Sequence, residues 1–418
     1  MENVIDILQK RGFVEAMTSE ELRTLTKYPV RVYCGFDPTS DSLHLGNMVA
    51  MMGLAWFQRS GHTPVAIVGG ATGMIGDPSG KSSERQLLNA ETIQRNTAGI
   101  KANLEKVLGN SALLLNNYDW FKNFSFIEVL REIGKYFRIG PMLAKESVRA
   151  RMNSEEGMSF TEFSYQILQA YDFLHLCEHH GVTVQLGGAD QWGNITAGTE
   201  LIRKVLGKNA YGLTFPLLTR SDGQKFGKTE KGAIWLSPDR LSPYEFYQYL
   251  FRTSDADVIK LMRLLTFMEM DEIERYASQM KEEGYIPNSS QKRLAEEVTR
   301  IVHGEEGVST ALRVTQGAAP GSSTELNAAA LEAIAADMPS RNLPLGEILQ
   351  VKLVDLLVNI GMQASKGEAK RLIRNGGVSI NNEKISDENY TLSEKHLVEQ
   401  KLLLVAVGKK NKMILRVT

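Results

Sequence analysis

Residues Tyr33–Asn47, which read YCGFDPTSDSLHLGN, decide the fold class of this chain. An apolar run of strand length ends at Gly35, an Asp-Pro pair marks a turn, and the HLGN motif of residues 44–47 stands where an apolar helical stretch begins. The free N–H groups and the dipole at such a helix N-terminus favour an anionic ligand such as a phosphate. The same pattern also fits a turn in which His44 and Asn47 only cap the helix.

Strand and helix patterns alternate on both sides of this segment. Apolar runs of strand length cover residues 30–35, 63–69 and 182–186, and each is followed by, or ends in, glycine. Stretches of helical length cover residues 47–58 and 162–179. This alternation predicts an α/β fold with a parallel sheet and helices on both faces, in which ligands bind at the carboxyl ends of the strands.

The 418 residues are enough for two to three domains. We expect a Rossmann-like parallel-sheet catalytic domain over residues 1–222, with a helical insertion at about 90–160. A lysine-rich loop and an all-helical domain follow over 223–316. An alanine- and glycine-rich linker over 317–344 then leads to a small α+β domain over 345–418.

Composition excludes several classes of protein. Apolar residues make up 43% and charged residues 23%, values typical of globular proteins. The two cysteines, Cys34 and Cys177, are too few for a disulfide framework or a four-cysteine zinc site. We expect a soluble cytoplasmic protein without a membrane partner, because the N-terminus lacks a signal-peptide pattern and no apolar run nears the ~18 residues of a membrane span.

The charge is unevenly distributed along the chain. The totals are 48 basic and 49 acidic residues, but residues 345–418 hold 12 basic and 8 acidic side chains. A basic C-terminal part indicates a polyanionic partner, although a solvated face is the other interpretation.

The glycine-rich segment 69–82, GGATGMIGDPSGKS, fits neither of two common nucleotide-binding motifs. A P-loop needs glycine where this chain has Ile75, and a dinucleotide fingerprint needs a glycine spacing that the segment lacks. The segment is therefore a flexible loop near the strand ends with one carboxylate, Asp77. That carboxylate either binds a ligand ammonium group or only forms a turn.

The segment 221–232, SDGQKFGKTEKG, contains three glycines and three lysines and predicts a mobile loop. Lys225 and Lys228 bracket a glycine, and Thr229 follows directly. Such a loop can fold over a polyphosphate and neutralise charge that develops during a reaction. A solvated lysine loop is the alternative.

The helix predicted over 162–179 carries polar side chains at spacings of four and three, which place them on one face: Tyr165, Gln169 and Asp172. Polar groups on an otherwise apolar helix indicate the wall of a pocket. Further along, Cys177, His179 and His180 precede Gly181, so we interpret them as the end of a helix and expect no metal site.

Two of these motifs resemble the signatures of one enzyme family. HLGN at 44–47 resembles the first signature of the class I aminoacyl-tRNA synthetases, and KFGKT at 225–229 resembles their second. The flanking segments YCGFDPT, GGATGMIGDPSGKS, FTEFSYQILQAYDF and GGADQWGNI resemble the bacterial-type tyrosyl-tRNA synthetases. The basic segment 364–381 resembles the S4-like RNA-binding domain of that family, so the resemblance covers the whole chain.

The resemblance implies a tyrosine–tRNA ligase. Such an enzyme activates L-tyrosine with ATP to tyrosyl-adenylate and pyrophosphate, then transfers tyrosine to the 3′ end of tRNA(Tyr). It also implies that Mg2+ accompanies ATP, that no organic cofactor is needed, and that the chain forms a homodimer. The helical part at 223–316 would be the anticodon-side domain.

Residue roles follow from the same resemblance. Tyrosine would be bound by Tyr33, Asp77, Tyr165, Gln169, Asp172 and Gln191. ATP would be bound by Cys34, Thr39, Gly46, Asn47, Gly188, Asp190 and Lys228. The phosphates would be met during catalysis by His44, Lys81, Arg85, Lys225, Lys228 and Thr229. The C-terminal domain would bind tRNA through Lys366, Lys370, Arg371 and Arg374. Asn47 departs from the family, because many members have a second histidine there, but its amide can still donate one hydrogen bond.

Two other classes of protein fit the sequence less well. An RNA-binding protein that has lost catalysis is disfavoured by the intact His44, Lys225 and Lys228. An NAD-dependent oxidoreductase is disfavoured by the glycine spacing in the segment 69–82.

Overall fold

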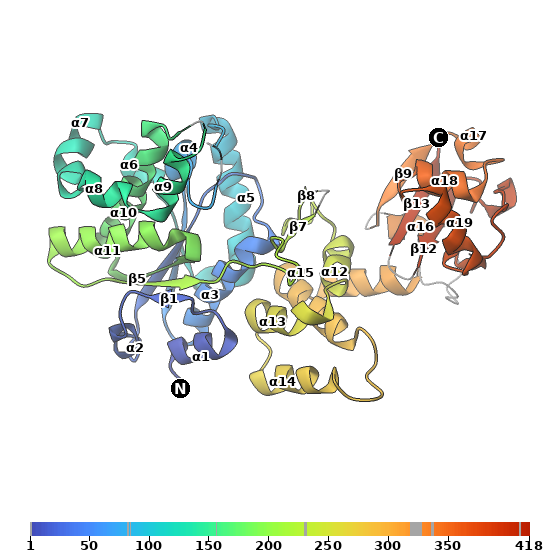
Figure 1. Cartoon of the computed structure of the whole chain (residues 1–418), viewed down its shortest axis with the longest axis horizontal. Coiled ribbons are helices and arrows are strands. Elements are labelled where there is room, and N and C mark those ends of the chain that lie inside the picture. Colours follow the sequence, from blue (N-terminus) through green and yellow to red (C-terminus); the bar gives the residue numbers. More distant parts are fainter. Residues whose placement is uncertain are drawn as a thin grey trace. The chain divides into compact units, whose positions relative to one another are not determined.

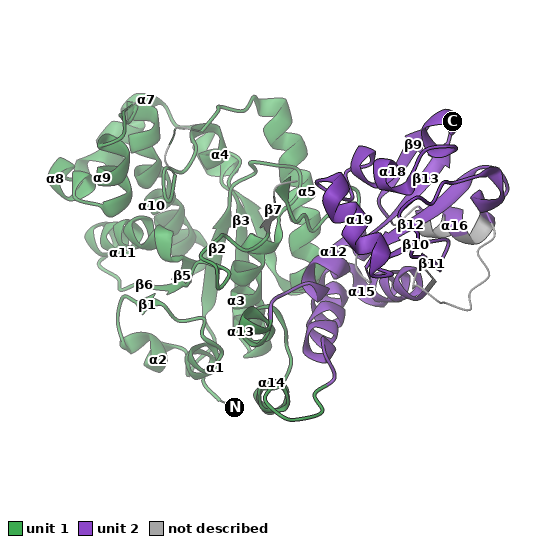
Figure 2. Cartoon of the chain, turned by 45° about the vertical axis from the view of Figure 1, so that its right-hand side comes forward, with its two compact units in different colours: residues 1–240, 255–285 green, residues 241–254, 286–418 purple. Residues whose placement is uncertain are grey.

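The structure is a computed structural model that describes residues 2–81, 83, 85–155, 157–229, 232–317, 328–335, 338–408 and 411–418. The chain divides into two compact units (Figure 2). The first unit contains residues 1–240 and 255–285, and the second contains 241–254 and 286–418. Among the described residues no helix is both long and apolar enough to cross a membrane. The finer division predicted from the sequence, into a catalytic domain, a loop with a helical domain, a linker and a C-terminal domain, stays a prediction.

A six-stranded sheet forms the centre of the first unit, with the order β1-β6-β5-β2-β3-β4. The strands are β1 (Ala16–Met17), β2 (Arg31–Phe36), β3 (Thr63–Val68), β4 (Leu113–Asn116), β5 (Val182–Gly188) and β6 (Tyr211–Phe215). All neighbouring strands are parallel except β1, which pairs antiparallel with β6. This confirms the predicted parallel-sheet α/β fold. The chain runs from β2 toward β3 on one side and reaches β5 on the other, so the switch point where ligands bind lies between β2 and β5.

Helices cover both faces of this sheet (Figure 1). The helix α3 packs on β2, β3 and β5 together with α5, while α10 and α11 pack on each other and on β5. Tyr33, Val65 and Ile67 of the sheet share a buried cluster with Phe173 of α10. The helices of the unit are α1 (Val4–Arg11), α2 (Glu21–Leu25), α3 (Met48–Arg59), α4 (Thr72–Ile75), α5 (Ala90–Leu108), α6 (Tyr118–Phe121), α7 (Phe126–Glu128), α8 (Ile139–Leu143), α9 (Glu146–Met152), α10 (Phe160–His180), α11 (Trp192–Leu206), α13 (Asp255–Leu265) and α14 (Met270–Gln279).

The stretch 90–160, predicted as a helical insertion, also contributes the edge strand β4. Leu113–Asn116 pairs in parallel with Val65–Val68 of β3. Its four residues are too short a run to stand out from the helical pattern around them. Behind it, Trp120 and Phe124 pack against the cluster under α10, so part of the insertion belongs to the core.

A five-stranded sheet with the order β11-β10-β12-β13-β9 lies in the second unit. Its strands are β9 (Ser340–Leu343), β10 (Val378–Ile380), β11 (Glu383–Ile385), β12 (Leu402–Val407) and β13 (Asn411–Val417). The helices of this unit are α12 (Pro243–Phe251), α15 (Ser289–Gly317), α16 (Ala328–Ala335), α17 (Leu345–Ile348), α18 (Leu353–Asn359) and α19 (Lys366–Arg374). The helix α16 and the strand β9 fall within the predicted linker, of which residues 318–327 and 336–337 lie outside the described part.

Both faces of the strand β12 are buried, which explains its uninterrupted apolar sequence. Leu403 and Val405 belong to the cluster beneath α18 and α19. Leu402 and Leu404 face the opposite way and pack with Val314 of α15. The C-terminal sheet is therefore packed directly on the helices before it within this unit, in addition to being joined to them by the chain.

Candidate active site

A cavity of about 540 Å³ lies at the carboxyl ends of the central strands of the first unit. It is lined by sixteen of the side chains or glycines predicted to form the site: Tyr33, Cys34, Thr39, His44, Gly46, Asn47, Asp77, Lys81, Arg85, Tyr165, Gln169, Asp172, Gly188, Asp190, Gln191 and Lys225. The side chains of Lys228 and Thr229 lie outside the described residues. The four predicted tRNA-binding residues lie on α19 of the second unit.

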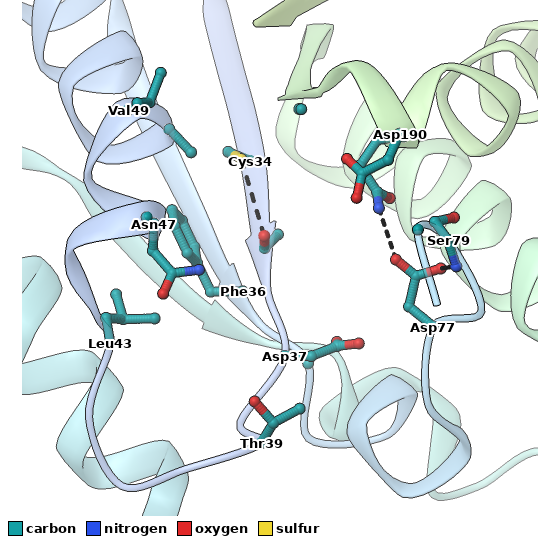
Figure 3. Close-up of a pocket in the computed structure, with 18 of the residues that line it drawn as sticks. Cys34, Phe36, Asp37, Thr39, Leu43, Asn47, Val49, Asp77, Ser79 and Asp190 are labelled. Carbon is teal, nitrogen blue, oxygen red and sulfur yellow. Dashed lines mark hydrogen bonds between the residues drawn. The ribbon is translucent and has the colours of Figure 1, made fainter. Parts of the chain in front are cut away.

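The pocket has two chemically different walls (Figure 3). Asn47 and Val49, at the beginning of α3, stand on one side. Asp77 and Asp190 stand on the opposite side, and Asp37 lies between the two walls after the end of β2. One wall therefore offers a helix N-terminus and the other offers carboxylates.

The innermost part of the pocket is formed by Tyr33 and Asp172. The Tyr33 side chain is 1% exposed, and its hydroxyl group has no hydrogen-bond partner among the described atoms. Burial, and then the Asp172 carboxylate, raise the pKa of Tyr33 well above its usual value. Burial likewise raises the pKa of Asp172 to about 8. A hydroxyl group without a partner beside a carboxylate is an arrangement that a polar ligand would complete.

Two donors that sequence reasoning missed hold the Asp172 carboxylate in place. Asn117 Nδ2 donates to Asp172 Oδ2 at 3.0 Å, and Trp120 Nε1 donates to Oδ1 at 2.9 Å. Both bonds lower the pKa of Asp172 and so oppose the effect of burial. Asn117 also donates to Thr72 Oγ1 at 2.9 Å, which ties the end of β4 to α4. If β4 had been predicted from the sequence, Asn117 would have been expected at the carboxyl ends of the strands, where ligands bind.

Asp37, which the sequence presented only as a turn residue, is part of the site. Its Oδ2 accepts the hydroxyl of Tyr165 at 2.8 Å, and its Oδ1 accepts the hydroxyl of Thr72 at 2.7 Å. Burial raises the pKa of Asp37 to about 6, with the nearby Asp77 adding to the effect. Tyr165 is thereby held with its oxygen facing the pocket.

Asp77 is fixed by three donors. Its Oδ2 accepts Gln191 Nε2 at 2.6 Å, and its Oδ1 accepts the backbone N–H of Ser79 at 3.0 Å and Asn194 Nδ2 at 3.4 Å. The buried Gln169 Oε1 has no hydrogen-bond partner in the described part of the chain. Carboxylate, phenol and amide oxygens in one cavity form a set of acceptors suited to an ammonium group.

The two signature motifs, far apart in sequence, meet at the N-terminus of α3. Leu45 donates its backbone N–H to the carbonyl of Ile234 at 2.8 Å, directly after the lysine-rich segment. Gly227 has φ +81° and approaches the backbone nitrogen of Gly46 so closely that a Cβ there would lie 3.0 Å from it. A side chain at Gly227 would push the loop away, and its positive φ also favours glycine. This contact keeps Lys225 at the mouth of the pocket.

The HLGN motif caps its helix and lines the pocket at once. The backbone N–H of Gly46 donates to His44 Nδ1 at 3.1 Å, and the backbone N–H of His44 donates to Asn47 Oδ1 at 3.0 Å. With its oxygen used in this way, Asn47 has its Nδ2 group available as the donor for a ligand. The capping interpretation and the functional interpretation are therefore compatible.

Metal ligation has no support in the described residues, where no group of three or more histidines, cysteines or acids could hold an ion. The helix α10 ends at Gly181, which has φ +62° and caps the carbonyl of Leu176. His179 and His180 thus stand in its last turn, as their sequence position predicts.

Comparison with known proteins gives a consistent result over the whole chain. Residues 25–318 match the family "tRNA synthetases class I (W and Y)", and residues 330–415 match the "Tyrosine--tRNA ligase SYY-like C-terminal domain". The chain is 66% identical over 421 residues to the tyrosine–tRNA ligase of Protochlamydia amoebophila, covering 100% of this chain and 99% of that protein. It is 47% identical over 417 residues to the tyrosine–tRNA ligase of Bacillus caldotenax, covering 98% of each.

A solved structure shows the same similarity. The C-terminally truncated mitochondrial tyrosyl-tRNA synthetase of Aspergillus nidulans matches with a TM-score of 0.67 and 30% identity. The match covers 74% of this chain and 92% of that one.

Proposed function

Since the chain belongs to the class I tRNA synthetases and, within them, to the tyrosine–tRNA ligases, we propose that its cavity of about 540 Å³ is the site of tyrosine activation. The enzyme joins L-tyrosine to ATP, releases pyrophosphate, and passes the tyrosyl group to the 3′ end of tRNA(Tyr). The observation that carries the assignment to this pocket is the buried Tyr33 hydroxyl, which has no partner, beside the anchored Asp172.

The phenol of tyrosine completes that pair. Its O–H donates to Asp172, and its oxygen accepts the hydroxyl of Tyr33. Phenylalanine offers neither group, so it would leave both buried polar groups unsatisfied. The α-ammonium group then lies among the acceptors Asp77, Tyr165 and Gln169, with Gln191 alongside.

ATP extends from the wall on the side of α3 toward the opposite wall, on which Asp190 lies. Its ribose and base lie along Cys34, Thr39, Gly46, Asn47, Gly188 and Asp190. The phosphates meet the N-terminus of α3, where His44 adds its imidazole, and the cationic residues Lys81, Arg85, Lys225 and Lys228, with Thr229 beside them. Arg85 is held by its Nε bond to the carbonyl of Asp77 at 3.2 Å.

The chemistry requires neither a protein base nor a covalent intermediate. The tyrosine carboxylate is already a nucleophile and attacks the α-phosphorus, and pyrophosphate leaves. Catalysis comes from holding the two substrates together and from cations that stabilise the growing negative charge. Mg2+ would accompany ATP and would help to neutralise the charge of its phosphates.

The test is exchange of labelled pyrophosphate into ATP, measured with each amino acid in turn. We expect exchange with L-tyrosine, and charging of tRNA(Tyr) when tRNA is added. Exchange that needs no amino acid, or that proceeds equally well with L-tryptophan or L-phenylalanine, would contradict the assignment of the pocket.

A homodimer is proposed from an apolar surface of the first unit. Six large apolar side chains are exposed on α7, on the π-helical turn Val129–Ile133 after it, on α8 and α9, and at the beginning of α10: Phe126, Ile127, Leu130, Ile139, Met152 and Phe160. Phe126 is 63% exposed and Phe160 is 66% exposed, which is unusual for phenylalanine in a monomer. Light scattering at micromolar concentration should give the mass of a dimer, and Phe160→Asp should give that of a monomer.

Binding of tRNA by the second unit is proposed from α19, on which Lys366, Lys370, Arg371 and Arg374 are all exposed. Lys366 pairs with Asp355 at 2.7 Å, and Arg374 pairs with Glu388 at 2.8 Å. Phosphates would displace these partly exposed carboxylates at modest cost, since the cationic partners are themselves exposed. We also propose a cytoplasmic location, because both cysteines are buried and unpaired, as in a reducing compartment.

A further inference from the structure

His175 lies three residues after Asp172 on α10. The imidazole of His175 lies flat against the indole of Trp120, with ring centroids 4.4 Å apart and planes inclined by 19°. The same indole donates its N–H to Asp172 Oδ1 at 2.9 Å. Trp120 is therefore held at its face by His175 and at its edge by the carboxylate.

The remaining ring contacts of His175 are with residues of its own helix, α10. The His179 ring stands 4.4 Å from it and inclined by 48°, and the Tyr171 ring stands at 6.2 Å. Burial, and after it the neighbouring His179 and His180, lower the pKa of His175 to about 4. The ring is therefore neutral at physiological pH and stacks on the indole without a charge to desolvate.

We propose that His175 is a positioning residue for tyrosine recognition, which keeps the Trp120 indole aligned so that its N–H stays on the Asp172 carboxylate. This proposal rests on the proposed function, in which Asp172 accepts the phenol of tyrosine. His175 itself does not line the cavity and touches no substrate. Its role is carried by a stacked ring pair between the last turns of α10 and the helix α6.

Removing the His175 ring should weaken one of the two hydrogen bonds that Asp172 accepts, the one from Trp120. Without His175 the indole loses the ring stacked on its face, so its N–H is held less firmly on the carboxylate and the bond from Asn117 carries more of the anchoring. A buried carboxylate with fewer donors favours its neutral form and becomes a poorer acceptor for the phenol. The ATP wall at α3 lies on the opposite face of the sheet from α10 and is unaffected.

The experiment compares four variants of the full-length chain in pyrophosphate exchange. His175→Ala removes the ring, His175→Leu keeps volume without a planar ring, and His175→Phe restores a flat ring. His179→Ala is the matched control, because His179 contacts His175 and is exposed. The quantities measured are KM for tyrosine, KM for ATP, kcat, and the ratio of kcat/KM for tyrosine to that for phenylalanine.

We expect the alanine and leucine variants to raise KM for tyrosine by roughly twofold to tenfold, the range of one aromatic pair, and to lower the tyrosine-to-phenylalanine ratio. KM for ATP should stay within about twofold of wild type, and His175→Phe and His179→Ala should resemble wild type. Unchanged KM for tyrosine in His175→Leu, an equal rise in both KM values, or no rescue by His175→Phe would overturn the proposal. Absence of tyrosine-dependent exchange in the wild-type protein would instead overturn the proposed function.

Discussion

Replacing Tyr33 with phenylalanine should make the ligand-free protein more stable and the enzyme less selective. The Tyr33 hydroxyl is buried without a hydrogen-bond partner, and such a group costs about 1–3 kcal/mol relative to its hydration in the unfolded chain. Phenylalanine keeps the ring, which packs 5.1 Å from the ring of Phe173. Part of the gain is lost to the small void left behind, so we expect the free energy of unfolding to rise by about 1 kcal/mol.

The effect on substrates has the opposite sign for the two amino acids. Tyrosine loses one hydrogen bond to its phenol, which is worth about 0.5–1.5 kcal/mol and lowers its kcat/KM by roughly twofold to tenfold. Phenylalanine no longer faces a hydroxyl that it cannot satisfy, so its kcat/KM should rise. The ratio of the two therefore falls by more than either value changes.

Urea unfolding of the ligand-free protein and pyrophosphate exchange with both amino acids measure the two effects. Tyr211→Phe is the matched control, because the Tyr211 hydroxyl donates to Glu21 at 2.8 Å and lies outside the cavity. It should give no gain in stability and no change in selectivity. A Tyr33→Phe protein that is less stable than wild type, or that keeps the wild-type ratio, would refute the reasoning.

Three further predictions follow from the same contacts. Lys225→Ala should lower kcat by about 10²–10³, as for other preorganised electrostatic groups, with KM for tyrosine nearly unchanged; a wild-type kcat would make the loop a solvated connection. Asp172→Asn should become progressively more stable than wild type from pH 4 to pH 8, because the pKa of Asp172 in the folded protein is raised to about 8. In the wild type, the stability that protonated Asp172 contributes is full below about pH 4 and is lost as pH rises through 8, at up to about 1.4 kcal/mol per pH unit. Urea unfolding of both proteins should show a difference in stability that grows with pH, and a constant difference would contradict the raised pKa. Truncation before Leu345 should leave pyrophosphate exchange nearly intact and abolish most charging of tRNA. The truncation also removes Lys412, whose Nζ donates to the carbonyl of Thr315 near the end of α15. Full charging by the truncated chain would show that the basic C-terminal part is not needed for tRNA.

Local pattern was sufficient for most of the sheet. Predicted strands at 30–35, 63–69 and 182–186 correspond within two residues to β2, β3 and β5. The edge strand β4 was missed because four residues, Leu113–Asn116, give no period that separates a strand from a helix. Asn117 was missed for the same reason, because only the pairing of β4 with β3 places it at the carboxyl ends of the strands, where the pocket lies.

Residues that line the pocket were easier to predict than the residues that orient them. Gln169 and Asp172 share one helix face, so spacing alone indicated a pocket wall. Trp120 and His175 looked like ordinary aromatic and helix-end residues, because their contact depends on where α6 packs against α10. No regularity along the chain encodes a contact of that kind, so only the tertiary structure could supply it.

The distribution of charge in the pocket explains why the residues of one side were easier to predict from the sequence than those of the other. Asp37 and Asp172 have raised pKa values, chiefly because of burial, so the proposed tyrosine side holds carboxylates whose charged form is unfavourable in the absence of a ligand. An arriving ammonium group and phenol would relieve this unfavourable energy, which makes it available for selective binding. Buried carboxylates of this kind need hydrogen-bond donors from several segments of the chain. Asn117 and Trp120 donate to Asp172, and Thr72 donates to Asp37. The phosphate side uses a helix N-terminus and solvated cations, which need little support, and this is why its short motifs were recognisable in the sequence.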